Sequence, residues 1–211
     1  MTRRFFCKWL FVLFPALLFI CGRVFIPRLV AQCLKAFQPD AAAGYETAAF
    51  LTLLICLVAA LYGYIRECRN ELKQPVCIGE AAVIRCLCVG IGMGMIAVLS
   101  AKLFGSESEI KIDVIWILTR CILGPITEEI VFRGLVYDRG SRYWGENNAL
   151  IISSLVFAGA HQGLFPMLEA FAAGFALGWL RKKEGSVLSP IYAHILMNTT
   201  VFATLAVSAR V

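Results

Sequence analysis

Two adjacent carboxylates and an arginine stand inside an apolar stretch of the chain. Glu128, Glu129 and Arg133 lie in the run 114–136, which is otherwise apolar enough to cross a bilayer. Each such charge at the centre of a membrane costs about 2.5 to 3.5 kcal/mol on insertion scales, so charges in this position indicate a function. The two carboxylates are therefore the first candidates for acid–base chemistry in this chain.

The spacing of these three residues on a helix divides their roles. Glu129 and Arg133 are four residues apart, so they share a helix face and can form an ion pair. Glu128 points about 100° away from that face. We interpret Glu129 and Arg133 as a structural support and Glu128 as a general base that faces a cavity. A plain buried ion pair that fixes helix packing is the alternative interpretation of Glu129 and Arg133.

The chain has two histidines, His161 and His194, and both lie in apolar surroundings. Polar side chains inside a membrane find few partners, and their burial is costly unless they contact one another. His194 and Asn198 are one helical turn apart, so both can direct hydrogen-bond donors toward one point, as an oxyanion site requires. No serine, cysteine or aspartate is placed to complete a nucleophilic triad. The pattern therefore favours an activated water as the nucleophile.

Composition indicates which elements position these residues. Of the 211 residues, 60% are hydrophobic and only 16% are charged, which is typical of a polytopic membrane protein rather than a soluble domain. We predict an all-α bundle in a single membrane domain, residues 1–211, with about seven membrane helices and a polar cavity between the fourth, fifth and seventh. Residues 22–39 either extend the first helix or form an interfacial amphipathic helix. The predicted spans are 5–20, 41–65, 81–103, 114–137, 148–160, 167–180 and 187–207.

Small residues in these spans indicate close packing of helices. Gly90, Gly92 and Gly94 lack the spacing of a phosphate-binding loop, whereas Gly174 and Gly178 have the spacing at which membrane helices approach one another. The nine cysteines include no CxxC pair. We expect them to be reduced, buried, small hydrophobic residues rather than a disulfide framework.

The net charge of +6 does not indicate nucleic-acid binding, because the basic residues lie in short clusters between apolar runs. Lys and Arg concentrate in the cytoplasmic loops of membrane proteins, and these clusters alternate with the acidic segment 105–113 and the uncharged turn 162–166. We predict a cytoplasmic N-terminus and a location in the plasma (inner) membrane. The basic clusters are at 3–8, 66–73, 139–142 and 181–183.

This topology requires the fifth span to be short. Glu128 and His194 fall toward the cytoplasmic halves of their spans, whereas His161 comes late in a span that runs outward. The three can meet only if the turn at 162–166 lies inside the protein, where irregular backbone is allowed if it lines a cavity. We predict a conical, water-filled cavity that opens to the cytoplasm or the inner leaflet.

Three motifs on separate apolar segments resemble those of the CPBP family, the CAAX prenyl protease and bacteriocin-processing intramembrane proteases that are also called the Abi family. The resemblance covers a motif-bearing core of about 112–207, and residues 1–110 carry no motif of the family. The motifs are Glu128-Glu129-x-x-x-Arg133, Phe157-x-x-x-His161 and His194-x-x-x-Asn198.

This resemblance implies a glutamate-type intramembrane endopeptidase without a cofactor. In that mechanism Glu128, aided by His161, activates water for attack on a peptide carbonyl. His194 and Asn198 stabilise the oxyanion, and Glu129 with Arg133 maintains the shape of the site. The implied substrate is a membrane-associated peptide or protein, which can be lipidated.

Two alternatives use the same residues. Glu128, His161 and His194 could hold a divalent metal that polarises water, although no HExxH spacing supports such a site. A non-proteolytic membrane protein could instead use the polar cluster to bind a peptide, as an immunity protein, or to carry an ion, as a small transporter.

Overall fold

The computed structural model describes residues 2–35, 41–68, 79–104 and 113–208, and within these ranges it contains helices and no strand. The predicted all-α fold is therefore confirmed. The helices are α1 (Thr2–Lys35), α2 (Ala41–Cys68), α3 (Glu80–Phe104), α4 (Val114–Ile117), the π-helix η1 (Leu118–Leu123), α5 (Gly124–Glu129), the π-helix η2 (Ile130–Tyr137), α6 (Asp138–Trp144), α7 (Glu146–Ala158), α8 (Leu164–Glu184) and α9 (Leu188–Ser208).

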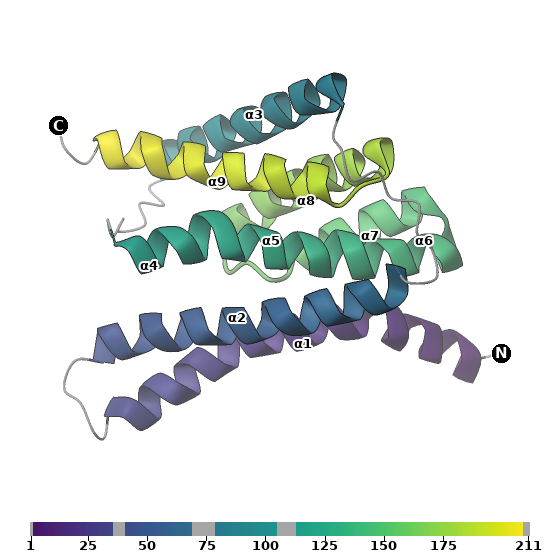
Figure 1. Cartoon of the computed structure of the whole chain (residues 1–211), viewed down its shortest axis with the longest axis horizontal. Helices are drawn as coiled ribbons and strands as arrows, with labels where there is room; N and C mark the ends of the chain where they lie inside the picture. Colours follow the sequence, from purple (N-terminus) through teal and green to yellow (C-terminus); the bar gives the residue numbers. More distant parts are fainter. Residues whose placement is uncertain (1, 36–40, 69–78, 105–112, 209–211) are drawn as a thin grey trace.

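The segments from α4 to α6 follow one another without a loop and form a central rod. Figure 1 shows the hairpin of α1 and α2 on one side of this rod and the pair α3 and α9 on the other. Helices α7 and α8 pack against each other behind the rod. The predicted site residues on the rod are thus surrounded by helices from both halves of the chain.

Four helices in the described part of the chain are long and apolar enough to cross a membrane: Cys7–Val30, Tyr45–Glu67, Glu80–Leu103 and Leu188–Val207. The chain is a multi-pass membrane protein, and the count of seven spans stays a prediction. Helix α7 has 13 residues and is about 20 Å long, which is less than the ~30 Å of hydrocarbon in a bilayer.

Helix α1 decides between the two interpretations of residues 22–39. It continues to Lys35, so the described part of that segment extends the first span and is not a separate interfacial helix. Pro15 and Pro27 lie inside this helix, and Figure 1 shows that its axis bends. Proline removes a backbone donor and crowds the preceding turn, which is a common cause of such bends.

Two π-helical segments lie on either side of the adjacent glutamates. η1 precedes α5, which carries both glutamates, and η2 carries Arg133. Pro125 has no N–H and crowds the turn before it, which is where η1 lies. π turns are rare and occur frequently at functional sites.

Helices α3 and α9 approach each other closely because α3 presents glycines to α9. A Cβ at Gly90 would lie 2.7 Å from the carbonyl oxygen of Ala193, and one at Gly94 would lie 2.9 Å from that of Met197. These contacts confirm the packing interpretation for Gly90 and Gly94. Gly92 points elsewhere, and no described atom of another helix lies within 4 Å of its Cβ position.

The other predicted pair of packing glycines lies between α7 and α8. A Cβ at Gly174 would be 3.3 Å from Cα of Ser154, and one at Gly178 would overlap the side chain of Leu150. Both glycines are buried. The spacing in the sequence therefore identified this packing face correctly.

We expect Gly90→Ala to lower the free energy of unfolding by about 1–3 kcal/mol, because the backbone of α9 must move away from the added methyl group. Gly92→Ala is the matched control and should be neutral or stabilising by up to about 1 kcal/mol, since alanine is the better helix former. Unfolding in mixed detergent and dodecyl sulfate, followed by tryptophan fluorescence, measures both. Equal loss in the two variants would contradict the packing described here.

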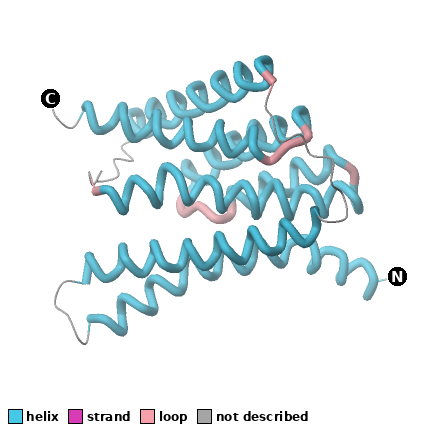
Figure 2. Tube along the Cα trace, viewed as in Figure 1, coloured by secondary structure: helices cyan, strands magenta, loops and turns pink. Residues whose placement is uncertain are grey.

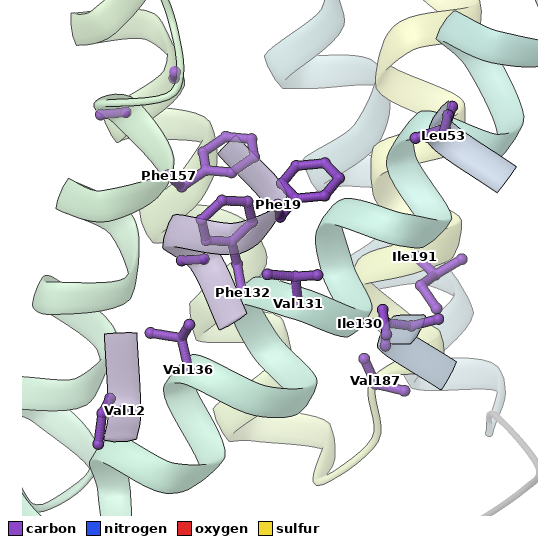
Figure 3. Packing of buried hydrophobic residues seen from close by; sticks show 14 residues of the cluster. Val12, Phe19, Leu53, Ile130, Val131, Phe132, Val136, Phe157, Val187 and Ile191 are labelled. Carbon is purple, nitrogen blue, oxygen red and sulfur yellow. The ribbon is translucent and has the colours of Figure 1, made fainter. Parts of the chain in front are cut away.

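An aromatic cluster connects α1, η2 and α7 (Figure 3). Phe132 from η2 contacts Phe19 from α1 and Phe157 from α7 edge to face, with centroid distances of 5.9 and 5.2 Å. Such pairs contribute about 0.5–1.5 kcal/mol beyond their buried area. Because Phe157 also touches both histidines, this cluster supports the site directly.

Seven cysteines have side chains that the structure describes, and all seven are free; Cys86 and Cys121 are buried as expected. The expectation of burial is wrong for four others, which are exposed: Cys7, Cys21, Cys33 and Cys88. The outer face of a membrane helix is directed to lipid, and lipid is as apolar as a leucine side chain. An apolar run therefore does not imply that all of its residues lie in a protein core.

Candidate active site

Glu129 lies at the centre of a buried polar network. Its Oε1 accepts a hydrogen bond of 2.8 Å from Arg133 Nη1 and lies 2.7 Å from Nδ1 of His194. The side chains of Glu129 and Arg133 are fully buried, and that of His194 is 3% exposed. The ion pair predicted from the spacing of Glu129 and Arg133 is therefore present, with His194 as an additional partner.

Arg133 connects the central rod to the neighbouring helices. Its Nη2 donates a hydrogen bond of 2.9 Å to the carbonyl oxygen of Gly174 in α8. The guanidinium also lies 4.6 Å from the ring centroid of Phe157 in α7. Arg133 therefore contacts both α7 and α8 from the rod.

Glu128 faces a different direction from Glu129 and is almost buried, with 7% of its side chain exposed. Its Oε1 forms an ion pair with Arg23 of α1, and its Oε2 lies 3.8 Å from Nε2 of His194. His194 therefore stands between the two glutamates and directs one ring nitrogen toward each of them. The sequence placed His194 in the oxyanion site and did not predict this bridging position.

One cavity of about 310 Å³ brings the four predicted catalytic residues together. Its walls come from α1, α3, the central rod, the end of α7 with the following turn, α8 and α9. Most of the remaining wall is apolar and includes Met93 and Phe157. The polar residues on the wall are Arg23, Arg120, Glu128, His161, Glu169, His194 and Asn198.

His161 reaches this cavity because α7 is short. The helix ends at Ala158, and Figure 2 shows the loop between α7 and α8 about halfway along the bundle, not level with its ends. The predicted fifth span, α7, is therefore short and the turn after it lies within the bundle, as the sequence analysis required for His161 to meet Glu128 and His194. Nδ1 of His161 is 3.1 Å from the carbonyl oxygen of Phe157, which can only accept, so Nδ1 donates there and Nε2 of the neutral ring is an acceptor.

His161 and Glu128 line the same cavity without an ion-pair contact in the described residues. The gap between an imidazole acceptor and a carboxylate is a position where water can be held by both groups. Apo sites often show catalytic groups at longer distances than the reacting complex requires.

Asn198 lies on the cavity wall one turn after His194. Its Nδ2 donates a hydrogen bond of 2.8 Å to the carbonyl oxygen of Arg120 in η1. An amide has two N–H donors, so this bond orients the side chain and leaves one donor for a ligand. The predicted partner His194 is engaged by the glutamates, so the two side chains do not form an isolated donor pair.

Arg23, Arg120 and Glu169 line the cavity and were not predicted from the sequence; of these, Arg23 contacts Glu128. Arg23 lies in the segment 22–39, whose structure the sequence left open, and residues 1–110 carry no motif. The available signal was an arginine directly before the apolar run 24–26, which in a continuous first helix places a charge at membrane depth.

Glu128, His161 and His194 do not form the three-ligand site that the metal alternative requires. Among the residues that the structure describes, no three His, Cys, Asp or Glu side chains are placed to hold one metal ion. The geometry therefore gives no support to this alternative.

The fold and the site define a class of protein: a multi-pass membrane protein with buried carboxylate and imidazole groups at the wall of a cavity. Residues 110–200 match the family model described as type II CAAX prenyl endopeptidase, Rce1-like. This match confirms the resemblance to the CPBP family over the segment that carries all three motifs.

Two curated proteins are similar to part of the chain. It is 38% identical over 87 residues to "Putative membrane peptidase YdiL" of Bacillus subtilis (strain 168), which is 40% of this chain and 35% of that protein. It is 35% identical over 103 residues to "Uncharacterized 24.3 kDa protein" of Escherichia coli, which is 46% of this chain and 47% of that protein. The chain thus spans between a third and a half of the length of these relatives. No solved structure matches it.

Proposed function

We propose that this chain is an intramembrane endopeptidase of the CAAX protease type, which hydrolyses a peptide bond of a membrane-associated peptide or protein. The observation that supports this most is the convergence of Glu128, His161, His194 and Asn198 on one cavity from three separate segments. A carboxylate and an imidazole on either side of a space for water is the arrangement that general-base hydrolysis requires. The similarity to a family of type II CAAX prenyl endopeptidases supports the same reaction class.

In this proposal Glu128 takes a proton from a water that is held between its carboxylate and Nε2 of His161. The water oxygen attacks the peptide carbonyl carbon, and Glu128 then delivers the proton to the departing amine.

The negative oxygen of the tetrahedral intermediate is stabilised by Asn198 and His194. Asn198 offers the N–H that is not used by the carbonyl of Arg120. With Nδ1 of His194 donating to an ionised Glu129, donation from Nε2 requires the doubly protonated ring, for which Glu129 is the counterion. Glu129 and Arg133 therefore position His194 instead of touching the substrate.

The charge distribution orients the cavity relative to the membrane. The N-terminus, α6 and the connection between α8 and α9 lie at the same end of the bundle in Figure 1. Lys8, Arg142 and Lys182 belong to the basic clusters of this end. Basic loops are cytoplasmic, which supports a cytoplasmic N-terminus in the plasma (inner) membrane.

The test compares membranes from cells that express the wild type or Glu128→Gln, with hydrolysis performed in ¹⁸O-labelled water. We expect new peptide termini only with the wild type and ¹⁸O in the new carboxyl groups, since water is the nucleophile. Repeating the wild-type reaction with a strong chelator should change nothing if no metal takes part. A protein that binds peptide without cleaving it would give identical termini in both membranes and would refute the proposed activity.

A further inference from the structure

Arg23 contacts the proposed base from a part of the chain that carries no protease motif. It lies in α1 and forms an ion pair with Oε1 of Glu128, while 40% of its own side chain stays exposed. The guanidinium also lies 5.8 Å from the ring centroid of Phe19. Among the described residues, Glu128 is the carboxylate that pairs with Arg23.

This ion pair opposes the chemistry proposed for Glu128. A cation in contact with a carboxylate stabilises its charged form and so resists transfer of a proton to it. The resistance disappears if Arg23 acquires another anion when the substrate binds. The cavity must then offer a position in which a substrate anion meets Arg23.

Arg120 provides a second cation at that position. It lines the same cavity, and its guanidinium lies 6.0 Å from the ring centroid of Trp116. In the part of the chain that the structure describes, Arg120 makes no ion pair. Glu169, the other carboxylate on the wall, lies within ion-pair distance of neither arginine. Within the described residues, Arg120 thus has no counterion, and the counterion of Arg23 is Glu128, the proposed base.

We propose that Arg23 and Arg120 form a subsite for a carboxylate of the substrate, and that its occupation draws Arg23 away from Glu128. This inference rests on the proposed function, because it assigns a substrate feature to that site. The planar guanidinium donates paired hydrogen bonds that match a carboxylate, whereas an amide cannot replace that charge. The carboxylate can come from the C-terminus of a peptide or from an acidic side chain close to the scissile bond.

Binding of labelled peptides to the full chain in lipid nanodiscs tests the subsite without requiring cleavage. The probes are one N-acetylated alanine–leucine peptide with a free C-terminal acid, its C-terminal amide, and the amide with one internal glutamate. We expect the acid, the glutamate peptide or both to bind the wild type at least about tenfold more tightly than the plain amide. The peptide that shows the preference identifies the source of the carboxylate. Equal affinities for all three would overturn the subsite.

Variants of the two arginines test whether they cause the preference for a peptide that carries a carboxylate. Arg23→Gln and Arg120→Gln should each remove most of it, Arg23→Lys should keep part of it, and the exposed Arg28→Gln on the same helix should keep all of it. A preference that survives in both glutamine variants would overturn the assignment.

The variant Glu128→Gln is expected to strengthen peptide binding, whereas a folding defect would weaken it. It removes the competing counterion of Arg23, so the preferred peptide should bind several-fold more tightly than it binds the wild type. Weaker or unchanged binding would show that Arg23 does not exchange partners. Because this experiment measures binding and not cleavage, its result stands apart from any failure to detect hydrolysis.

Discussion

Replacing Glu128 with glutamine is expected to lower the rate of peptide hydrolysis by about 100-fold to 10,000-fold while the bundle stays folded. Glutamine has nearly the same shape as glutamate and can still contact Arg23, but it cannot accept a proton from water. The buried network of Glu129, Arg133 and His194 should stay intact, because its hydrogen bonds do not involve Glu128, whose Oε2 lies 3.8 Å from Nε2 of His194. The variant therefore removes only the base. Cleavage of a peptide identified by the comparison of termini above measures the effect.

Two further variants make this expectation specific. Glu128→Asp keeps the carboxylate but withdraws it by one methylene, so activity should lie between those of the wild type and Glu128→Gln. Glu169→Gln removes an equal charge from the same cavity and should have only a small effect, because Glu169 contacts none of the four proposed catalytic residues. A folded Glu128→Gln protein that hydrolyses its substrate at the wild-type rate would eliminate Glu128 as the base.

Replacing Arg133 with methionine is expected to lower the free energy of unfolding by about 3–5 kcal/mol. The variant leaves the carboxylate of Glu129 fully buried without its cation, and it removes the donor to the carbonyl of Gly174. Unfolding in mixed detergent and dodecyl sulfate gives the measurement. The control is Lys182→Met, which breaks the exposed pair with Glu146 and should cost no more than about 1 kcal/mol.

The double variant Arg133→Met/Glu129→Gln separates the two interpretations of this pair. It should recover part of the lost stability, since no uncompensated charge stays buried. If Glu129 also positions His194, hydrolysis should stay low in the double variant even where stability returns. Full recovery of both would mean that the pair only fixes helix packing, as the alternative interpretation holds.

The sequence alone determined the features that depend on local geometry and composition. The pairing of Glu129 with Arg133 follows from their spacing of four, because residues one turn apart meet on any helix, and it persists although η2 is a π-helix. The all-α membrane fold follows from the apolar runs, and the packing of Gly90, Gly94, Gly174 and Gly178 follows from the lack of side chains at helical intervals.

The tertiary structure decided the features that depend on how helices rotate and how deep each residue lies. The contact of Arg23 with Glu128 joins residues 105 positions apart, and no pattern within α1 indicates which face of that helix meets α5. The position of His194 between the two glutamates and the bond from Asn198 to the carbonyl of Arg120 are set by the rotation of α9 against the central rod. An amphipathic pattern marks the polar face of a helix, but in a membrane almost every face is apolar, so side-chain packing between helices chooses the partners.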